Sequence, residues 1–160
     1  MKCTGIIAEY NPFHNGHRYH IEKAKELIGA QYVIVVMSGS FVQRGDVAVC
    51  DKFTRARQAL LGGADIVISL PTPFSLSNAE LFARAGVTLL RATGLVDSIC
   101  FGSASGDIQL LNSTAKKIYC ESAEFKESLA YCLGSGASYP RALAKALGPE
   151  MNAVLSDPKR

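Results

Sequence analysis

Four short apolar runs constrain the fold of this chain more than any other feature of its sequence. Each is rich in Ile and Val and almost continuous rather than alternating; the runs cover Cys3–Ala8, Tyr32–Met37, Asp65–Leu70 and Val96–Phe101. Continuous apolar runs of this length are typical of strands that helices cover on both faces of a parallel sheet. The sequence therefore predicts an α/β fold built around such a sheet.

Segments with helical periodicity lie between these runs. The first helix is expected to start at residues 15–17 and to end at Gly29, and the second to cover about residues 51–61. The third is expected to begin at Ser77, with Glu80 completing a capping box. This alternation predicts βαβ units with right-handed crossovers in a Rossmann-like sheet of strand order 3-2-1-4.

The helical pattern also predicts burial and domain organisation. We expect the second helix to bury Phe53, Ala56, Ala59 and Leu60, and the third to be buried on almost every side over residues 81–90. After the fourth run the periodicity is helical only, over about residues 107–120, 122–133 and 138–147. The predicted organisation is an α/β core over residues 1–106 and a C-terminal helical segment over residues 107–150 that continues the same domain.

Charge and cysteine content narrow the class of protein. The chain has 17 Lys and Arg against 14 Asp and Glu, and only 19% of its residues are charged. This excludes a disordered charged tail and permits a nucleic-acid partner without requiring one. The five cysteines are widely spaced without a Cys-x-x-Cys pair, which suits neither a disulfide framework nor a zinc site. No secretory signal or membrane span is evident, so we expect a cytoplasmic protein with no membrane contact.

The turn after the first run contains all three histidines of the chain, His14, His17 and His20. Pro12 and Gly16 make residues 11–16 a turn, so a helix can start only at its end. The N-terminus of a helix exposes backbone N–H groups and the positive end of its dipole, which together favour an anion. We expect His14 and His17 to point into the same space above the strand ends.

Two imidazoles and a helix N-terminus around one phosphoryl group suit phosphoryl or nucleotidyl transfer, because they stabilise the charge that builds in the transition state. Two other interpretations remain open. The three histidines could form a metal site, although no cysteine and no obvious carboxylate other than that of Glu9 joins them. They could also serve only as capping and core residues.

The string His14-Asn15-Gly16-His17 resembles the His-x-Gly-His signature of the nucleotidyltransferase superfamily. Longer segments are more specific, namely Glu-Tyr-Asn-Pro-Phe-His-Asn-Gly-His at 9–17, Met-Ser-Gly-Ser-Phe-Val-Gln-Arg-Gly at 37–45, Gly-Ala-Asp-Ile-Val-Ile-Ser-Leu-Pro at 63–71 and Phe-Gly-Ser at 101–103. Together they resemble the N-terminal portion of the bacterial tRNA(Met) cytidine acetate ligase family over essentially the whole chain. Such enzymes use ATP to activate acetate as acetyl-adenylate, and then acetylate N4 of the wobble cytidine of elongator tRNA(Met).

The resemblance implies which residues bind ATP. His14 and His17 would be catalytic and would stabilise the α-phosphorus as acetate displaces pyrophosphate. The ATP-binding residues that it assigns are Ile7, Ala8, Glu9, Tyr10, Asn11, Pro12, Phe13, His14, Asn15, Gly16, His17, Arg18, Tyr19, His20 and Gly102. With strand order 3-2-1-4, the turn carrying the histidines and the loop carrying Gly102 should face each other across one crevice. Mg²⁺ is expected from the chemistry of the triphosphate, without a visible ligand set.

Basic residues are densest in a cluster with Gln43, made of Arg44, Lys52, Arg55 and Arg57. They are expected either to bind pyrophosphate or the tRNA backbone, or to form a solvated helix face. The hydroxyls of Ser38 and Ser40 are expected either to reach a ligand or to belong to an ordinary turn. The sequence indicates no oligomeric state.

The sequence also departs from the family pattern. Family members are longer, and Lys159 and Arg160 follow Pro158 where the family has two asparagines. Ala104 stands where relatives usually carry an acidic residue, and a downstream Ser/Thr-rich motif with its Arg is missing. Residues 151–160 are therefore expected to be a truncated tail. Two alternatives to the ligase stay open: a stand-alone adenylyltransferase for a small substrate, and an inactive nucleotide-binding remnant.

Overall fold

The computed structural model describes residues 1–103 and 106–148 of the chain. Its internal contacts divide the chain into two compact units, Met1–Phe101 and the residues from Gly102 onward. The predicted tail at 151–160, with Lys159 and Arg160, lies outside the described residues, as does Ala104.

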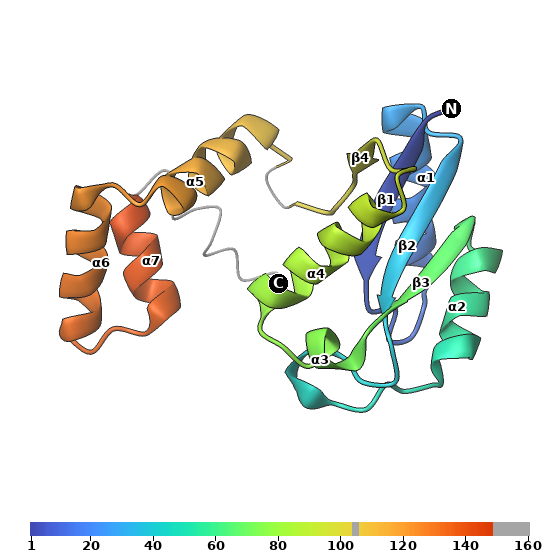
Figure 1. Ribbon diagram of the computed structural model, residues 1–160, viewed down its shortest axis with the longest axis horizontal. Coiled ribbons are helices and arrows are strands. Elements are labelled where there is room, and N and C mark those ends of the chain that lie inside the picture. Colours follow the sequence, from blue (N-terminus) through green and yellow to red (C-terminus); the bar gives the residue numbers. More distant parts are fainter. Residues whose placement is uncertain (104–105, 149–160) are drawn as a thin grey trace. The chain divides into compact units, whose positions relative to one another are not determined.

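Four parallel strands form one sheet in the order β3-β2-β1-β4 (Figure 1). They are β1 (Cys3–Ala8), β2 (Tyr32–Ser38), β3 (Ile66–Leu70) and β4 (Ser98–Ile99). The predicted fold class and strand order are therefore confirmed. The fourth strand is much shorter than the apolar run at 96–101, because it is an edge strand that pairs with β1 only through Thr4 and Gly5.

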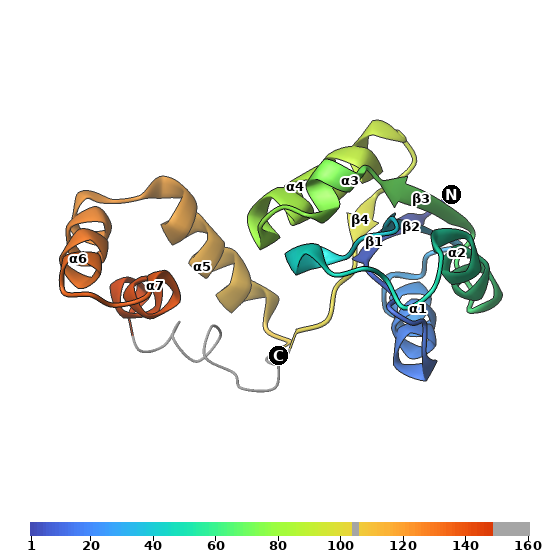
Figure 2. The ribbon, with the colours of Figure 1, turned by 90° about the horizontal axis from the view of Figure 1, so that it is seen from below.

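Helices cover both faces of this sheet. On one face lie α1 (Asn15–Ile28) and α2 (Lys52–Leu61), and on the other lies α4 (Ala79–Ala92), as Figure 2 shows. Two short elements have no counterpart in the sequence prediction: the 3-10 helix η1 (Gln43–Gly45) in the loop after β2, and α3 (Thr72–Ser75) after β3. The crossovers between parallel strands thus bring both loops, and the loop after β1, to the carboxyl edge of the sheet.

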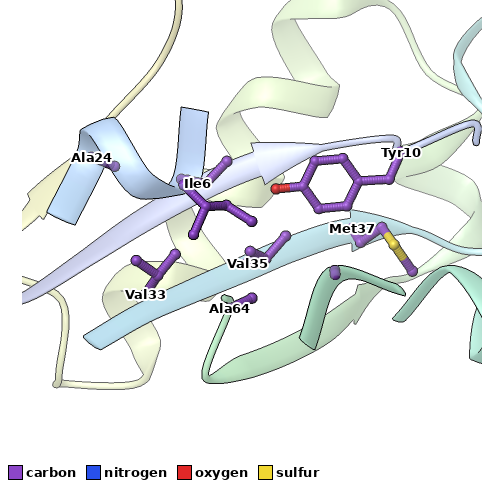
Figure 3. Packing of buried hydrophobic residues seen from close by; sticks show 9 residues of the cluster. Ile6, Tyr10, Ala24, Val33, Val35, Met37 and Ala64 are labelled. Atoms are coloured by element: carbon purple, nitrogen blue, oxygen red, sulfur yellow. The ribbon is translucent and has the colours of Figure 1, made fainter. Parts of the chain in front are cut away.

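The sheet separates two clusters of buried side chains. The cluster on the α1 and α2 face is drawn in Figure 3, where the Tyr10 ring extends back along β1 with its hydroxyl toward Ile6. The other cluster joins the sheet to α4 through Leu90. A Cβ atom at Gly86 of α4 would lie only 2.8 Å from Ile7 Cδ1, so the absence of a side chain there lets the helix approach β1 closely.

Three details of the helix prediction are wrong. In α2, Phe53 and Leu60 are exposed, whereas Arg55 is completely buried together with Ala59. In α4, the N-cap is Asn78 rather than Ser77, because the Asn78 carboxamide accepts a hydrogen bond from the backbone N–H of Leu81. The body of α4 is also less buried than expected, since its middle and first turn expose apolar side chains.

The second unit consists of three helices, α5 (Ile108–Cys120), α6 (Ala123–Gly134) and α7 (Tyr139–Leu147), which matches the three helical segments expected there. Phe125 and Leu147 form its small core. That this unit continues the same domain as the sheet stays a prediction. Among the described helices, none combines the length and apolar character that crossing a membrane requires.

Candidate functional site

The loop between β1 and α1 brings together most of the residues predicted to bind ATP. Ile7 and Ala8 end β1, residues 9–13 form the loop, His14 is the N-cap of α1, and residues 15–20 form its first turns. Tyr10 has a left-handed backbone (φ 49°), and the following Asn11–Pro12 peptide bond is cis. The loop connects the carboxyl end of β1 to the start of α1, so the helix N-terminus lies at the carboxyl edge of the sheet.

His14 and His17 cap the helix reciprocally. The Nδ1 atom of His14 accepts a hydrogen bond from the backbone N–H of Gly16 (3.1 Å), and Nδ1 of His17 accepts one from the backbone N–H of His14 (3.2 Å). This is the geometry of a capping box built from two imidazoles. A Cβ atom at Gly16 would lie 2.9 Å from Cε1 of His14, so a side chain at this position would displace the capping imidazole.

The two imidazoles form the outer part of an aromatic stack. Their ring centroids are 3.7 Å apart and their planes are 24° from parallel. The His17 ring also contacts Tyr10 at 4.7 Å and Phe13 at 5.6 Å between centroids. Tyr10 is buried and His17 half-buried, whereas His14 is exposed. Packing against the core thus holds His17, and His17 in turn holds His14.

The protonation of these rings follows from their surroundings. Burial, and the nearby His14 and His20, lower the pKa of His17 from 6.5 to about 4, so its imidazole is neutral at pH 7. A neutral ring that accepts a hydrogen bond at Nδ1 carries its proton on Nε2. The same tautomer follows for His14 from the hydrogen bond that its Nδ1 accepts. Each ring therefore offers one N–H donor, at Nε2, beside the helix N-terminus.

His20 does not take part in this cap. It lies one turn further along α1, half-buried, and burial lowers the pKa of its imidazole. Its Nε2 atom is buried and has no hydrogen-bond partner among the described residues. Within the part of the chain that the structure describes, no group of three or more His, Cys, Asp or Glu side chains is placed to hold a metal ion.

The long loop after β2 fastens the histidine loop in place. The Glu9 carboxylate accepts a hydrogen bond from the backbone N–H of Gln43 (2.6 Å), and the Asn11 carboxamide oxygen accepts one from the backbone N–H of Val49 (2.7 Å). Phe13 packs against the end of α2, since a Cβ atom at Gly62 would lie 2.3 Å from its ring. Two polar residues of the histidine loop thus support its shape rather than face solvent freely.

Burial separates Arg55 from the other described members of the predicted basic cluster, and the side chain of Arg44 lies outside the part that the structure describes. Arg55 is buried and donates to three backbone carbonyl groups, so it does not belong to an exposed anion-binding patch. Lys52 lies over the Phe53 ring, with 5.2 Å between Nζ and the ring centroid, and Arg57 is exposed. Ser38 is completely buried, with no hydrogen-bond partner for its hydroxyl among the described residues, and Ser40 is exposed.

Gly102 is the one predicted ATP contact outside residues 7–20. It belongs to the second unit and is exposed, and a Cβ atom added there would meet nothing within 4 Å. Its predicted approach to the histidine loop stays a prediction.

The burial of Arg55 was missed from the sequence. The one signal for it was its spacing of four residues from the buried Ala59 on the same helix.

Known proteins resemble this chain in sequence and in fold. The family model for HIGH Nucleotidyl Transferase matches residues 1–159. The tRNA(Met) cytidine acetate ligase of Clostridium novyi is 51% identical over 147 residues, which are 92% of this chain and 37% of that protein. The enzyme of the same name from Clostridium acetobutylicum is 47% identical over 156 residues, which are 98% of this chain and 39% of that protein.

A solved structure shares the fold. The crystal structure of Thermotoga maritima TmcAL bound with alpha-thio ATP gives a TM-score of 0.88 at 47% identity, and the match covers 92% of this chain and 36% of that one. The chain thus spans well under half of the length of the relatives that it matches. Since the family model covers almost every residue and the sheet has the fold expected of it, this chain belongs to the HIGH Nucleotidyl Transferase family.

Proposed function

We propose that the chain binds ATP at the N-terminus of α1 and belongs to a cytoplasmic tRNA(Met) cytidine acetate ligase. The reaction is activation of acetate to acetyl-adenylate, followed by acetylation of N4 of the wobble cytidine of elongator tRNA(Met). Relatives that carry this name at 47–51% identity support the proposal, as does a structural relative bound to an ATP analogue. The observation that carries it is the pair of Nε2–H donors on His14 and His17 beside a helix N-terminus.

The reciprocal cap explains how these residues would act. In the first step, a carboxylate oxygen of acetate forms a bond to the α-phosphorus and the bond to pyrophosphate breaks, so negative charge builds on the phosphate oxygens. The Nε2–H groups of the two histidines lie beside the positive end of the α1 dipole and would donate to such an anion. Donors fixed in advance in this way are typically worth about 10²–10³ in rate each.

The His17 imidazole would act as a neutral donor. A pKa of about 4 keeps the His17 ring neutral at pH 7, and the backbone hydrogen bond that Nδ1 accepts leaves the remaining proton on Nε2. No rotation or proton uptake is needed before the ring can bind phosphate. Mg²⁺ enters this proposal with ATP as part of the substrate, since the only carboxylate of the loop, on Glu9, is held by Gln43.

ATP–pyrophosphate exchange with and without acetate tests the proposal. Acetate-dependent exchange by this chain, abolished by His14→Asn and by His17→Gln, is the expected result for the activation step. Exchange that needs a different small substrate would favour a stand-alone adenylyltransferase. ATP binding without any exchange would favour a nucleotide-binding remnant. Acetylation of an elongator tRNA(Met) transcript, measured by mass spectrometry of its nucleosides, tests the second step.

A further inference from the structure

Arg55 is a charged side chain that the structure buries completely within α2. Its guanidinium donates through Nε to the carbonyl oxygen of Cys50 (3.1 Å), through one terminal nitrogen to that of Glu9 (2.6 Å), and through the other to that of Gly39. The three acceptors lie in the loop before α2, in the loop after β1 and directly after β2. One side chain therefore joins both ends of the loop between β2 and α2 to the loop that carries the histidines.

This arrangement is costly as a means of stabilising a fold. Burial lowers the pKa of Arg55, which shows that its surroundings disfavour the charged form. Among the described residues it forms no ion pair with a carboxylate. Three backbone carbonyl groups and the electrostatic attraction of Glu9 and Asp51 oppose this cost. An apolar side chain of similar volume often serves stability as well as or better than a buried charge. What only a guanidinium supplies is several donors in a fixed planar geometry.

The bond to Glu9 reaches the histidines through one further residue. The Glu9 carbonyl belongs to the peptide that enters Tyr10, the residue with a left-handed backbone. The buried Tyr10 ring in turn contacts the His17 ring, with 4.7 Å between their centroids. A shift of the Glu9 carbonyl would therefore move the surface against which His17 is packed.

We propose that Arg55 is a positioning residue of the nucleotide site, which fixes the turn at Glu9 and Tyr10 and thereby the orientation of the His17 imidazole. This inference rests on the proposed function of His17 as a phosphate donor. The loop after β2 also helps to hold the histidine loop, because the backbone N–H groups of Gln43 and Val49 donate hydrogen bonds to it. Arg55 donates hydrogen bonds to the carbonyl groups at both ends of that loop, Gly39 and Cys50. Through its bond to the Glu9 carbonyl, it ties these ends to the histidine loop.

The test compares Arg55→Lys and Arg55→Gln with the matched control Arg57→Gln, an exposed arginine of the same helix. A lysine keeps the charge, but its single nitrogen cannot span three carbonyl groups in the geometry of a guanidinium. In ligand-free protein, nitrogen-15 NMR of the histidine side chains should show the neutral Nε2–H form of His17 in wild type and control. Both Arg55 variants should shift the His17 signals and move its pKa toward the ordinary value.

Binding of ATP and of adenosine, measured by calorimetry, provides the second readout. In both Arg55 variants the affinity for ATP should fall by about tenfold or more, because misplacement of a binding group by about 1 Å is expensive. The affinity for adenosine should stay the same. Unchanged His17 signals and an unchanged ATP-to-adenosine ratio in a folded Arg55 variant would overturn the inference. Wild-type protein that binds ATP no better than adenosine would instead contradict the proposed function, while the NMR readout still decides the role of Arg55.

If neither Arg55 variant folds, hydrogen exchange in the wild-type protein decides. The inference expects the Gln43 and Val49 amides to exchange with the same opening free energy as the Arg55 Nε–H, because one buried group holds the loop together. Exchange of these two amides at low denaturant, independent of Arg55, would contradict it.

Discussion

The imidazole rings of His14 and His17 lie stacked 3.7 Å apart, and each accepts a backbone hydrogen bond that helps to cap the helix they begin. Each ring therefore has two roles at once. Its Nδ1 atom stabilises the first turn of α1, and its Nε2–H remains available to a ligand. Because other side chains can supply an acceptor without supplying that donor, substitution can separate the two roles.

At the N-cap, His14→Asn should preserve the fold and remove the phosphate donor. Asn is among the most favourable N-cap residues, so we expect the free energy of unfolding to stay the same or to rise by up to about 1 kcal/mol. ATP affinity should fall by about tenfold, toward that of adenosine. Urea unfolding and calorimetry measure the two effects.

The control for this variant is His14→Ala, which removes both the cap and the donor. It should cost about 0.5–2 kcal/mol of stability and should weaken ATP binding as much as Asn does. If His14→Asn kept the wild-type preference for ATP over adenosine, the Nε2–H of His14 would have no part in phosphate binding.

The histidine loop could be predicted from sequence because its signals are local. Pro12, Gly16 and the histidines all lie within a few residues of the helix start that they define, and the apolar run at 3–8 coincides with β1. The tautomers of His14 and His17 could not be predicted, since they depend on which backbone N–H each Nδ1 meets. Only the folded cap supplies that information.

The burial of Arg55 was missed for a different reason. Hydrophobicity assigns Phe53 and Leu60 to the core, yet the space beneath α2 contains carbonyl groups that need donors. One of these acceptors, at Glu9, lies 46 residues away in the sequence, and another, at Gly39, lies 16 away. The hydrophobic pattern within a helix cannot show that carbonyl groups of distant loops need a buried donor. The predicted length of β4 was wrong for a similar reason. The number of residues in an edge strand depends on how many of them pair with its neighbour, here only Thr4 and Gly5 of β1.

Because α4 lies close to β1, we expect substitution of Gly86 by alanine to lower stability rather than raise it. Gly86→Ala adds a Cβ atom that would lie 2.8–2.9 Å from three side-chain atoms of Ile7. Alanine favours a helix by about 1 kcal/mol over glycine, but overpacking typically costs about 1–3 kcal/mol. We therefore expect a net loss of stability in thermal unfolding, and a shift of β1 that reaches the histidine loop.

The matched control is Gly134→Ala at the end of α6, where a Cβ atom would meet nothing within 4 Å. Without a clash, only the helix propensity remains, so this variant should be as stable as wild type or more so. A Gly86→Ala protein that gained stability as Gly134→Ala does would show that Ile7 moves aside without cost.

The lowered pKa of His17 predicts how stability depends on pH. The folded state has a pKa of about 4 at this group and the unfolded chain an ordinary value of 6.5, so the unfolded chain takes up the proton first as pH falls. The free energy of unfolding should therefore decrease as the pH falls from about 6.5 to about 4. Below that range, His17 should cause no further decrease. His20 acts in the same direction, since burial lowers its pKa too.

His17→Gln isolates the contribution of His17 to this pH dependence. Glutamine at the third helical position of a capping box accepts the same backbone hydrogen bond, so the cap to His14 should survive without a titrating ring. Urea unfolding between pH 7 and pH 5, above the range in which carboxyl groups ordinarily titrate, should give a smaller slope for this variant than for wild type. Part of the remaining slope belongs to His20, and His20→Gln should remove that part. Equal slopes for wild type and His17→Gln would show that His17 titrates near its ordinary pKa and is not held against Tyr10 in the way described.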